Sequence, residues 1–329
     1  MAIKFRTNLV LSPTNPSISY NKAMLLLGSC FTENIGKHLA HLKFNTCINP
    51  FGILYNPLSI NEALQCLIKN KQFVGTDLLQ HHDQWFSFAH HGRFSSANKT
   101  DCLTHINQSL AVGAQSLRTT DVLIITLGTA WVYRLQSNNR VVANCHKLPA
   151  KHFKRERLSS LDWTTALGES LAQIKQLNPK LQVIFTLSPI RHWKDGAVEN
   201  QLSKALLLVG IHELCKQHTY LNYFPAYEIM MDDLRDYRFY AEDLLHPNAT
   251  AITYIWEQFK IAHLHASTKP LIAAIQKINS AYQHRPIQAN SMAHQQFKQQ
   301  QIQKIQQLQA QYSHLSLDFA EEMRFFGAE

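Results

Sequence analysis

Three short apolar runs, each followed by polar residues, constrain most strongly what this chain folds into. The runs are Ala23–Leu27, Val122–Leu127 and Val183–Leu187. Each is too short for a free-standing helix and is typical of a strand buried on both faces. The polar residues that follow them are Gly28-Ser29-Cys30, Gly128-Thr129 and Ser188-Pro189. Ligands bind beyond the carboxyl ends of parallel strands. The polar residues at these strand ends therefore predict a binding site at one edge of the sheet.

Helical periodicity fills the stretches between these runs. The predicted helices are Thr32–Leu42, Ser59–Lys69, Leu103–Ser116, Trp163–Leu177 and Asn200–Cys215. A further strand is predicted at Tyr220–Pro225, leading into Ala226–Asp233. This alternation of strand and helix predicts a doubly wound α/β domain.

The composition is that of an ordinary globular protein, with 45% hydrophobic and 17% charged residues among 329. The first twenty residues lack a basic segment followed by an apolar run, and no stretch approaches the roughly 18 apolar residues of a membrane span. The cysteines are far apart, which indicates neither a zinc site nor a disulfide framework. We therefore expect a cytoplasmic protein with reduced thiols and no metal.

After about residue 262 the composition changes to Gln, Lys, Ala and His, with apolar residues at helical spacing. We expect a catalytic domain over 1–262 and a helical extension over 263–329. Because sustained heptads are lacking, the apolar stripe of the extension is predicted to pack on the domain or on a second copy in a homo-oligomer. A solvated, glutamine-rich helix is the alternative.

The formal charge of +9 raises the question of polyanionic partners, and the densest basic run is Lys147–Arg157. No aromatic interleaving or nucleic-acid motif accompanies this run. We interpret it as a solvated basic loop in preference to a contact for an anionic substrate, a membrane surface or nucleic acid, and nucleic acid is not expected as a partner.

Ser29 and the pair Asp243 and His246 are the candidate catalytic residues. Ser29 lies between an apolar strand and a helix, where its hydroxyl is a candidate nucleophile and N–H groups of the helix start can stabilise an oxyanion. The alternative is a helix N-cap. Asp243 and His246 are three residues apart on a turn, so the carboxylate can orient the imidazole as a base. Their alternative role is a capped turn that opens the helix Ala249–Lys260.

Several segments of the sequence, including those that contain Ser29, Asp243 and His246, resemble the conserved blocks of a known family. The segment 27–36, Leu-Gly-Ser-Cys-Phe-Thr-Glu-Asn-Ile-Gly, is similar to the signature of the GSCFA family, a bacterial branch of the SGNH/GDSL hydrolases. The segments 49–52, 126–131 and 188–193 resemble its internal blocks, and Asp243-Leu-Leu-His246-Pro resembles the last block of the superfamily. The resemblance covers about residues 20–260.

The resemblance implies a three-layer α/β/α flavodoxin-like fold and a Ser-His-Asp mechanism of ester hydrolysis or acyl transfer without a cofactor. It assigns the nucleophile to Ser29 and the acid–base pair to Asp243 and His246. It also assigns oxyanion-hole N–H groups to Ser29 and Gly52, while Gly128 begins the third block. That block usually reads G-x-N-D, and its asparagine is absent here. Thr129 and Asn49 are candidate substitutes, or else turn formers.

Other residues near the strand exits are candidates for binding substrate. Arg191 and His192 would place a cation beside a carboxylate or phosphate, and Trp131 would line an acyl or sugar pocket. An ion pair or simple packing is the alternative for each. Cys30, beside the proposed nucleophile, is interpreted as a packed small hydrophobe.

Three functions are compatible with these residues. The first is a serine esterase that acts on an O-acyl or small ester through an acyl-Ser29 intermediate. The second is an acyltransferase on the same triad, and the third is a binding protein with this fold and weakened catalysis. The presence of Ser29, Asp243 and His246 together argues against the binding protein, whereas the sequence alone does not separate the esterase from the acyltransferase.

Overall fold

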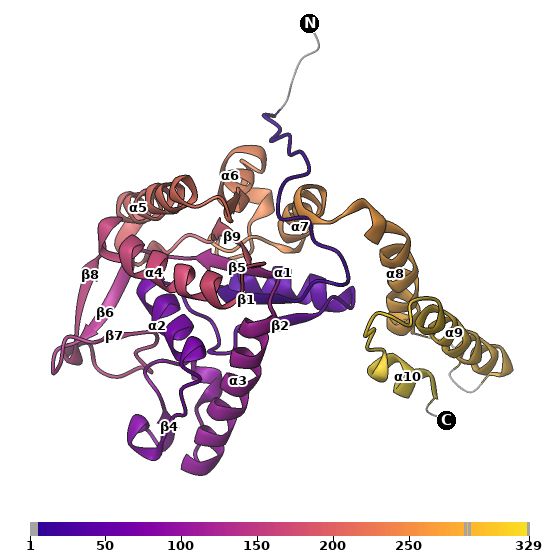
Figure 1. Ribbon diagram of the computed structural model, residues 1–329, viewed down its shortest axis with the longest axis horizontal. Coiled ribbons are helices and arrows are strands. Elements are labelled where there is room, and N and C mark those ends of the chain that lie inside the picture. Colours follow the sequence, from indigo (N-terminus) through magenta and orange to yellow (C-terminus); the bar gives the residue numbers. More distant parts are fainter. Residues whose placement is uncertain (1–5, 286–287, 289–290, 328–329) are drawn as a thin grey trace, which may run out of the picture.

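A five-stranded parallel sheet lies at the centre of the protein, in a computed structural model that describes residues 6–285, 288 and 291–327 (Figure 1). The strand order is β10-β9-β5-β1-β2. The strands are β1 (Met24–Gly28), β2 (Thr46–Ile48), β5 (Val122–Leu127), β9 (Gln182–Leu187) and β10 (Leu221–Phe224). Numbered by position in the chain, the order is 2-1-3-4-5, the flavodoxin-like doubly wound order. The predicted fold class is confirmed.

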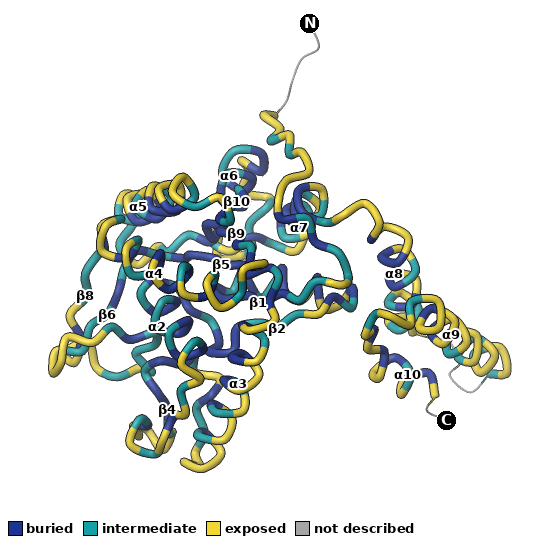
Figure 2. The backbone as a smooth tube through the Cα atoms, in the orientation of Figure 1, coloured by how far each residue is buried: buried dark blue, intermediate teal, exposed yellow. Residues whose placement is uncertain are grey.

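Helices cover both faces of the sheet because successive strand residues point to opposite sides. Leu25 and Leu27 of β1 join the buried cluster formed with α2 to α5, whereas Met24 and Leu26 join the cluster formed with α1 and α7. The buried sheet is visible between exposed outer helix surfaces (Figure 2). The helices are α1 (Cys30–His41), α2 (Pro57–Ile68), α3 (Lys99–Thr119), α4 (Leu161–Leu177), α5 (Gly196–Gln217) and α7 (Ala249–His263).

Short elements, most of them single helical turns, fill several connections. They are η1 (Gly75–Asp77), η2 (Gly92–Phe94), η3 (Ala150–His152), η4 (Trp193–Asp195), α6 (Ala226–Glu228), η5 (Ile229–Asp233), η6 (Tyr237–Phe239) and η7 (Ala266–Thr268). A small hairpin is formed by β3 (Leu79–His81) and β4 (Gln84–Phe86).

An antiparallel sheet between β5 and α4 corrects one sequence interpretation. It contains β6 (Trp131–Leu135), β7 (Val141–Val142) and β8 (Phe153–Arg157) in the order β7-β6-β8. The basic run 147–157, interpreted as a solvated loop, ends in strand β8. Its Arg155 and Arg157 form ion pairs with Asp195 and Glu199, which lie about forty residues further along the chain. Distant partners of this kind leave no signal in the local sequence.

The C-terminal segment is helical, with α8 (Lys269–Gln283), α9 (Met292–Gln311) and α10 (Ala320–Gly327). Buried residues of these helices, such as Ile275 and Ile305, belong to the same apolar cluster as Met24. Lys43, just after α1, forms an ion pair of 2.7 Å with Glu322 of α10. The division into two domains and the homo-oligomer remain predictions. No helix among the described residues is both long and apolar enough to cross a membrane.

Candidate active site

A cleft of about 610 Å³ opens at the carboxyl ends of β1, β5 and β9. Six of the predicted site residues line it, namely Ser29, Thr129, Trp131, Arg191, His192 and His246. Five of them follow β1, β5 or β9 in the chain, and the sixth, His246, lies on the loop before α7. The fold therefore brings together residues that are more than two hundred positions apart, at the sheet edge where the apolar runs predicted a site.

Ser29 is the N-cap of α1, and it also lines the cleft. Its Oγ accepts a hydrogen bond of 3.3 Å from the Phe31 N–H. The preceding Gly28 has φ +144°, and a Cβ on it would lie 2.3 Å from the Thr126 carbonyl oxygen of β5. A side chain at position 28 would thus clash with the neighbouring strand. The capping role and the catalytic role proposed for Ser29 are compatible.

His246 and Asp243 form a tightly bonded pair on the loop before α7. The Asp243 Oδ1 accepts 2.9 Å hydrogen bonds from the N–H groups of Leu245 and His246, and Oδ2 lies 2.5 Å from His246 Nδ1. These two N–H groups, together with the imidazole, hold the pKa of Asp243 at about 2, below its ordinary value. A carboxylate on Nδ1 favours the tautomer with the proton there, which leaves Nε2 as an acceptor.

Ser29 and His246 line the same cleft. Among the described residues, no hydrogen bond joins the Ser29 hydroxyl to the imidazole of His246. Ser29 is 1% exposed, whereas the His246 side chain is 50% exposed. Contacts between nucleophile and base are often loose before substrate binds, so this arrangement is compatible with the roles proposed for both residues.

Asn248 anchors the loop that carries His246. Its Oδ1 caps α7 by accepting from Ala251 N–H at 3.0 Å, and its Nδ2 donates to the Arg238 carbonyl oxygen at 2.7 Å. We expect Asn248→Ala to lower the free energy of unfolding by about 1 kcal/mol and also to reduce the ester hydrolysis that the sequence predicts, because the His246 loop loses its anchor. Urea denaturation and a p-nitrophenyl acetate assay measure the two effects.

Asn98→Ala is the matched control for this prediction. Asn98 caps α3 by accepting from the N–H groups of Thr100 and Asp101, at 2.8 and 3.2 Å, and it does not line the cleft. We expect a similar loss of stability with hydrolysis unchanged. Equal losses of activity in both variants would show that Asn248 acts through global stability alone.

Three predicted oxyanion-hole residues lie outside the cleft lining, and their polar groups are engaged elsewhere. The Gly52 N–H donates to the Asn49 carbonyl oxygen at 2.7 Å, and the Gly128 N–H donates to the Tyr55 carbonyl oxygen at 2.8 Å. The Asn49 side chain is buried and accepts from Gly28 N–H at 2.8 Å. Their role as oxyanion donors therefore stays a prediction that this arrangement does not support.

The other two predicted donors line the cleft but also have partners. The Ser29 N–H donates to the Thr126 carbonyl oxygen over a long 3.3 Å. The Thr129 hydroxyl lies 3.2 Å from Ser203 Oγ and accepts from the Trp131 N–H. Cys30, at the first position of α1, also lines the cleft, which its interpretation as a packed hydrophobe did not predict. Burial raises the pKa of its thiol, so the thiol stays protonated near neutral pH.

A polar stripe on α5 holds the loops that follow β5 and β9, and the sequence analysis did not identify it. The ammonium of Lys204, which is fully buried, donates to the carbonyl oxygens of Gly128 and Ser188, each at 2.7 Å. Ser203 Oγ accepts from Ala130 N–H at 2.8 Å, and Asn200 Oδ1 accepts from His192 N–H at 2.9 Å. One helix thereby positions two walls of the cleft.

The charges around this stripe affect one another. Burial lowers the pKa of Lys204 to about 7. Burial, followed by the nearby charges of Lys204, His246 and Arg155, lowers the pKa of His192 to about 3. The imidazole of His192 is consequently neutral at physiological pH.

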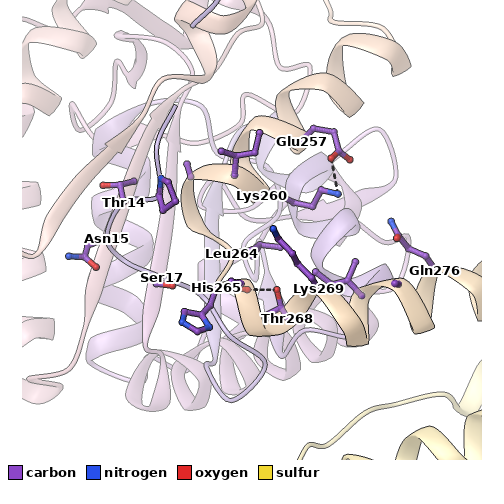
Figure 3. Close-up of a pocket in the computed structure, with 16 residues that line it drawn as sticks. Thr14, Asn15, Ser17, Glu257, Lys260, Leu264, His265, Thr268, Lys269 and Gln276 are labelled. Carbon is purple, nitrogen blue, oxygen red and sulfur yellow. Dashed lines mark hydrogen bonds and ion pairs between the residues drawn. The ribbon is translucent and has the colours of Figure 1, made fainter. Parts of the chain in front are cut away.

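A larger cavity, of about 810 Å³, lies elsewhere on the protein (Figure 3). It is formed by the segment 13–17, the end of α7 and the start of α8, and it contains none of the predicted site residues. Its Lys260 and Glu257 pair with each other at 2.8 Å. In the part of the chain that the structure describes, no three His, Cys, Asp or Glu residues group so as to hold a metal ion.

The fold and the cleft together define a flavodoxin-like α/β protein whose site occupies the carboxyl edge of its parallel sheet. The chain belongs to the GSCFA family, whose model matches residues 23–259. A second model, described as the C-terminal domain of GSCFA domain proteins, matches residues 275–329. The resemblance found in the sequence is thereby confirmed.

Other comparisons are more distant. No curated protein matches the chain. One similar solved structure is an acetyl xylan esterase from the rumen bacterium Butyrivibrio proteoclasticus, with a TM-score of 0.35 and 10% sequence identity. The likeness covers 74% of this chain but 63% of that one, less than two thirds of its length. The family match, and not this likeness, classifies the chain.

Proposed function

We propose that the protein is a serine hydrolase of the SGNH/GDSL esterase type that cleaves an O-acyl or other small ester. One observation carries the proposal: Ser29 and His246 line the same cleft, and Asp243 holds Nδ1 of that histidine at 2.5 Å. The parts of a hydrolytic triad are a serine at the end of a strand, an imidazole that can accept a proton at Nε2 and a carboxylate on Nδ1.

The reaction proceeds in two halves. His246 Nε2 takes the proton of the Ser29 hydroxyl while Oγ forms a bond to the acyl carbon of the ester. The tetrahedral adduct then expels the alcohol, which receives the proton from Nε2. In the second half, water gives a proton to Nε2 and attacks the acyl-serine, which releases the carboxylic acid and restores the Ser29 hydroxyl. Asp243 stabilises the imidazolium throughout.

The start of α1 stabilises the negative charge that develops on the oxygen of the tetrahedral adduct. The first N–H groups of a helix lack intrahelical partners, and the partial positive charge of the helix dipole lies there. Cys30 lines the cleft directly after Ser29, so its N–H is our candidate oxyanion donor, with the Ser29 N–H and the Thr129 hydroxyl as further candidates. Loss of one such donor costs about two to three orders of magnitude in rate.

A fluorophosphonate probe tests the proposal directly, because it forms a phosphorus–oxygen bond to an activated serine with loss of fluoride. We expect mass spectrometry to locate the adduct on Ser29 in the wild type and in Cys30→Ala, and to detect none in Ser29→Ala or His246→Ala. An adduct on Cys30, or well-folded wild type that stays unlabelled, contradicts the proposed nucleophile and favours a binding protein.

A further inference from the structure

Arg191 is a cation without an anionic partner in the cleft. No hydrogen bond or ion pair of its side chain is present among the described residues, and its Nε is buried without a partner. Its guanidinium lies 4.7 Å from the centre of the Trp193 ring, an arrangement that holds the planar group in place. A buried guanidinium N–H without an acceptor is unfavourable, so the site is incomplete without a ligand that supplies one.

The position of Arg191 links two hollows. It lines the cleft that contains Ser29 and His246, and it also lines a neighbouring hollow of about 560 Å³. Trp193 and Leu245 line both hollows as well, so these residues form the wall between them. A substrate whose ester group lies at the proposed triad can therefore place another of its groups beside Arg191.

The charge of the cleft lining favours an anion. Among the described residues, its lining contains Arg155, Arg191 and Lys194 but neither aspartate nor glutamate, whereas Asp236 and Asp243 line the neighbouring hollow. Arg155 is neutralised by a bidentate pair with Asp195, and it stacks on Trp131 with its guanidinium 4.2 Å from the ring centre. Arg191 forms no such pair with a carboxylate in the part of the chain that the structure describes. Arg191 also lowers the pKa of Lys204, so a second cation beneath the cleft experiences its charge.

We propose that Arg191 binds a carboxylate or phosphate group of the substrate, so that the enzyme prefers anionic esters. The inference rests on the proposed function, since it names the substrate class of the same site. A guanidinium presents paired N–H donors that match the oxygens of either anion, and such charge-assisted hydrogen bonds are stronger than neutral ones. The uncharged part of the substrate extends towards Ser29.

Two matched pairs of esters test the preference and distinguish the two anions. The first pair is 4-nitrophenyl hemiglutarate and 4-nitrophenyl valerate, and the second is 1-acetylglycerol 3-phosphate and 1-acetylglycerol. We expect wild type to favour the anionic member of one pair, and Arg191→Gln to reduce that ratio of kcat/KM by about 10- to 100-fold, chiefly through KM. Arg191→Lys should restore part of the ratio, because it keeps the charge but not the paired donors.

Arg134→Gln is the control for the change of charge. Arg134 forms an ion pair with Glu156 on the antiparallel sheet and does not line either hollow, so the ratio should not change. A wild-type ratio near one in both pairs, or an equal change in Arg191→Gln and Arg134→Gln, overturns the proposal.

Calorimetric titration of wild type and Arg191→Gln with glutarate and with inorganic phosphate separates this inference from the hydrolase function. Binding that Arg191→Gln weakens at least tenfold supports the anion site even when every ester stays intact, in which case the hydrolase proposal alone fails. Ester hydrolysis without Arg191-dependent binding or preference contradicts the anion site and leaves the hydrolase in place.

Discussion

Replacing His246 with alanine is expected to lower kcat/KM for ester hydrolysis by about six orders of magnitude, down to the residual rate that substrate binding and the oxyanion donors alone support. Without the imidazole, the Ser29 hydroxyl loses the base that is proposed to take its proton as the bond to the acyl carbon forms. The measurement is steady-state hydrolysis of p-nitrophenyl acetate. Because the His246 side chain is half exposed, its removal should cost little stability.

Asp243→Asn is expected to reduce ester hydrolysis less than His246→Ala does. The amide keeps an oxygen for the N–H groups of Leu245 and His246, so the turn is retained. Its NH₂ group faces His246 Nδ1 and favours the wrong tautomer, so we expect a loss of about four orders of magnitude. Retention of activity within tenfold of wild type in either variant would exclude the proposed triad.

The sequence predicted the sheet well because its strands are buried on both faces. The run Val122–Leu127 coincides with β5. The run Val183–Leu187 differs from β9 by one residue at its start, and the run Ala23–Leu27 differs from β1 by one residue at each end. The helix boundaries are less accurate, since caps such as Asn98 lie several residues before the first apolar position. Strand β2 was not predicted, because its three residues are too short for a pattern to be recognised.

The candidate site was predicted only in part. Ser29, Asp243 and His246 are short-range signals, since each is recognisable from its immediate neighbours. The oxyanion donors depend on which backbone groups are already paired. The Gly52 N–H is paired within its own turn, with Asn49, whereas the Gly128 N–H is paired with Tyr55, which only the folded chain brings to it. The position of Arg155 in the cleft was also not predicted, because it depends on a pair with Asp195, which is distant in the sequence.

Lys204 illustrates a signal that was present but not recognised. Asn200, Ser203, Lys204, Leu207, Ile211 and Leu214 recur at helical spacing and form the buried face of α5. Polar residues on an apolar stripe indicate either a functional site or a buried hydrogen-bonding network, because burying a charge without partners is unfavourable. The prediction that follows from Lys204 concerns stability.

The free energy of unfolding of wild type is expected to rise with pH, relative to that of Lys204→Met, between about pH 7 and pH 10.5. Burial lowers the pKa of Lys204 from 10.5 to about 7, so between these values the unfolded chain binds the proton more tightly than the folded one. A higher pH then favours the folded state, by up to about 1.4 kcal/mol per pH unit. Below pH 7 both states carry the proton and the contribution is constant.

Urea denaturation at pH 7.5 and 9.5 measures this difference, which we expect to be about 2 kcal/mol larger at the higher pH. Lys204→Met should be the less stable protein at pH 9.5, because the carbonyl oxygens of Gly128 and Ser188 lose the donor that a neutral amine still provides. Lys216→Met, an exposed lysine on the same helix, should follow wild type at both pH values. If Lys204→Met and wild type show the same pH dependence, the lysine keeps its charge when buried, and a permanent cation then lies beneath the cleft.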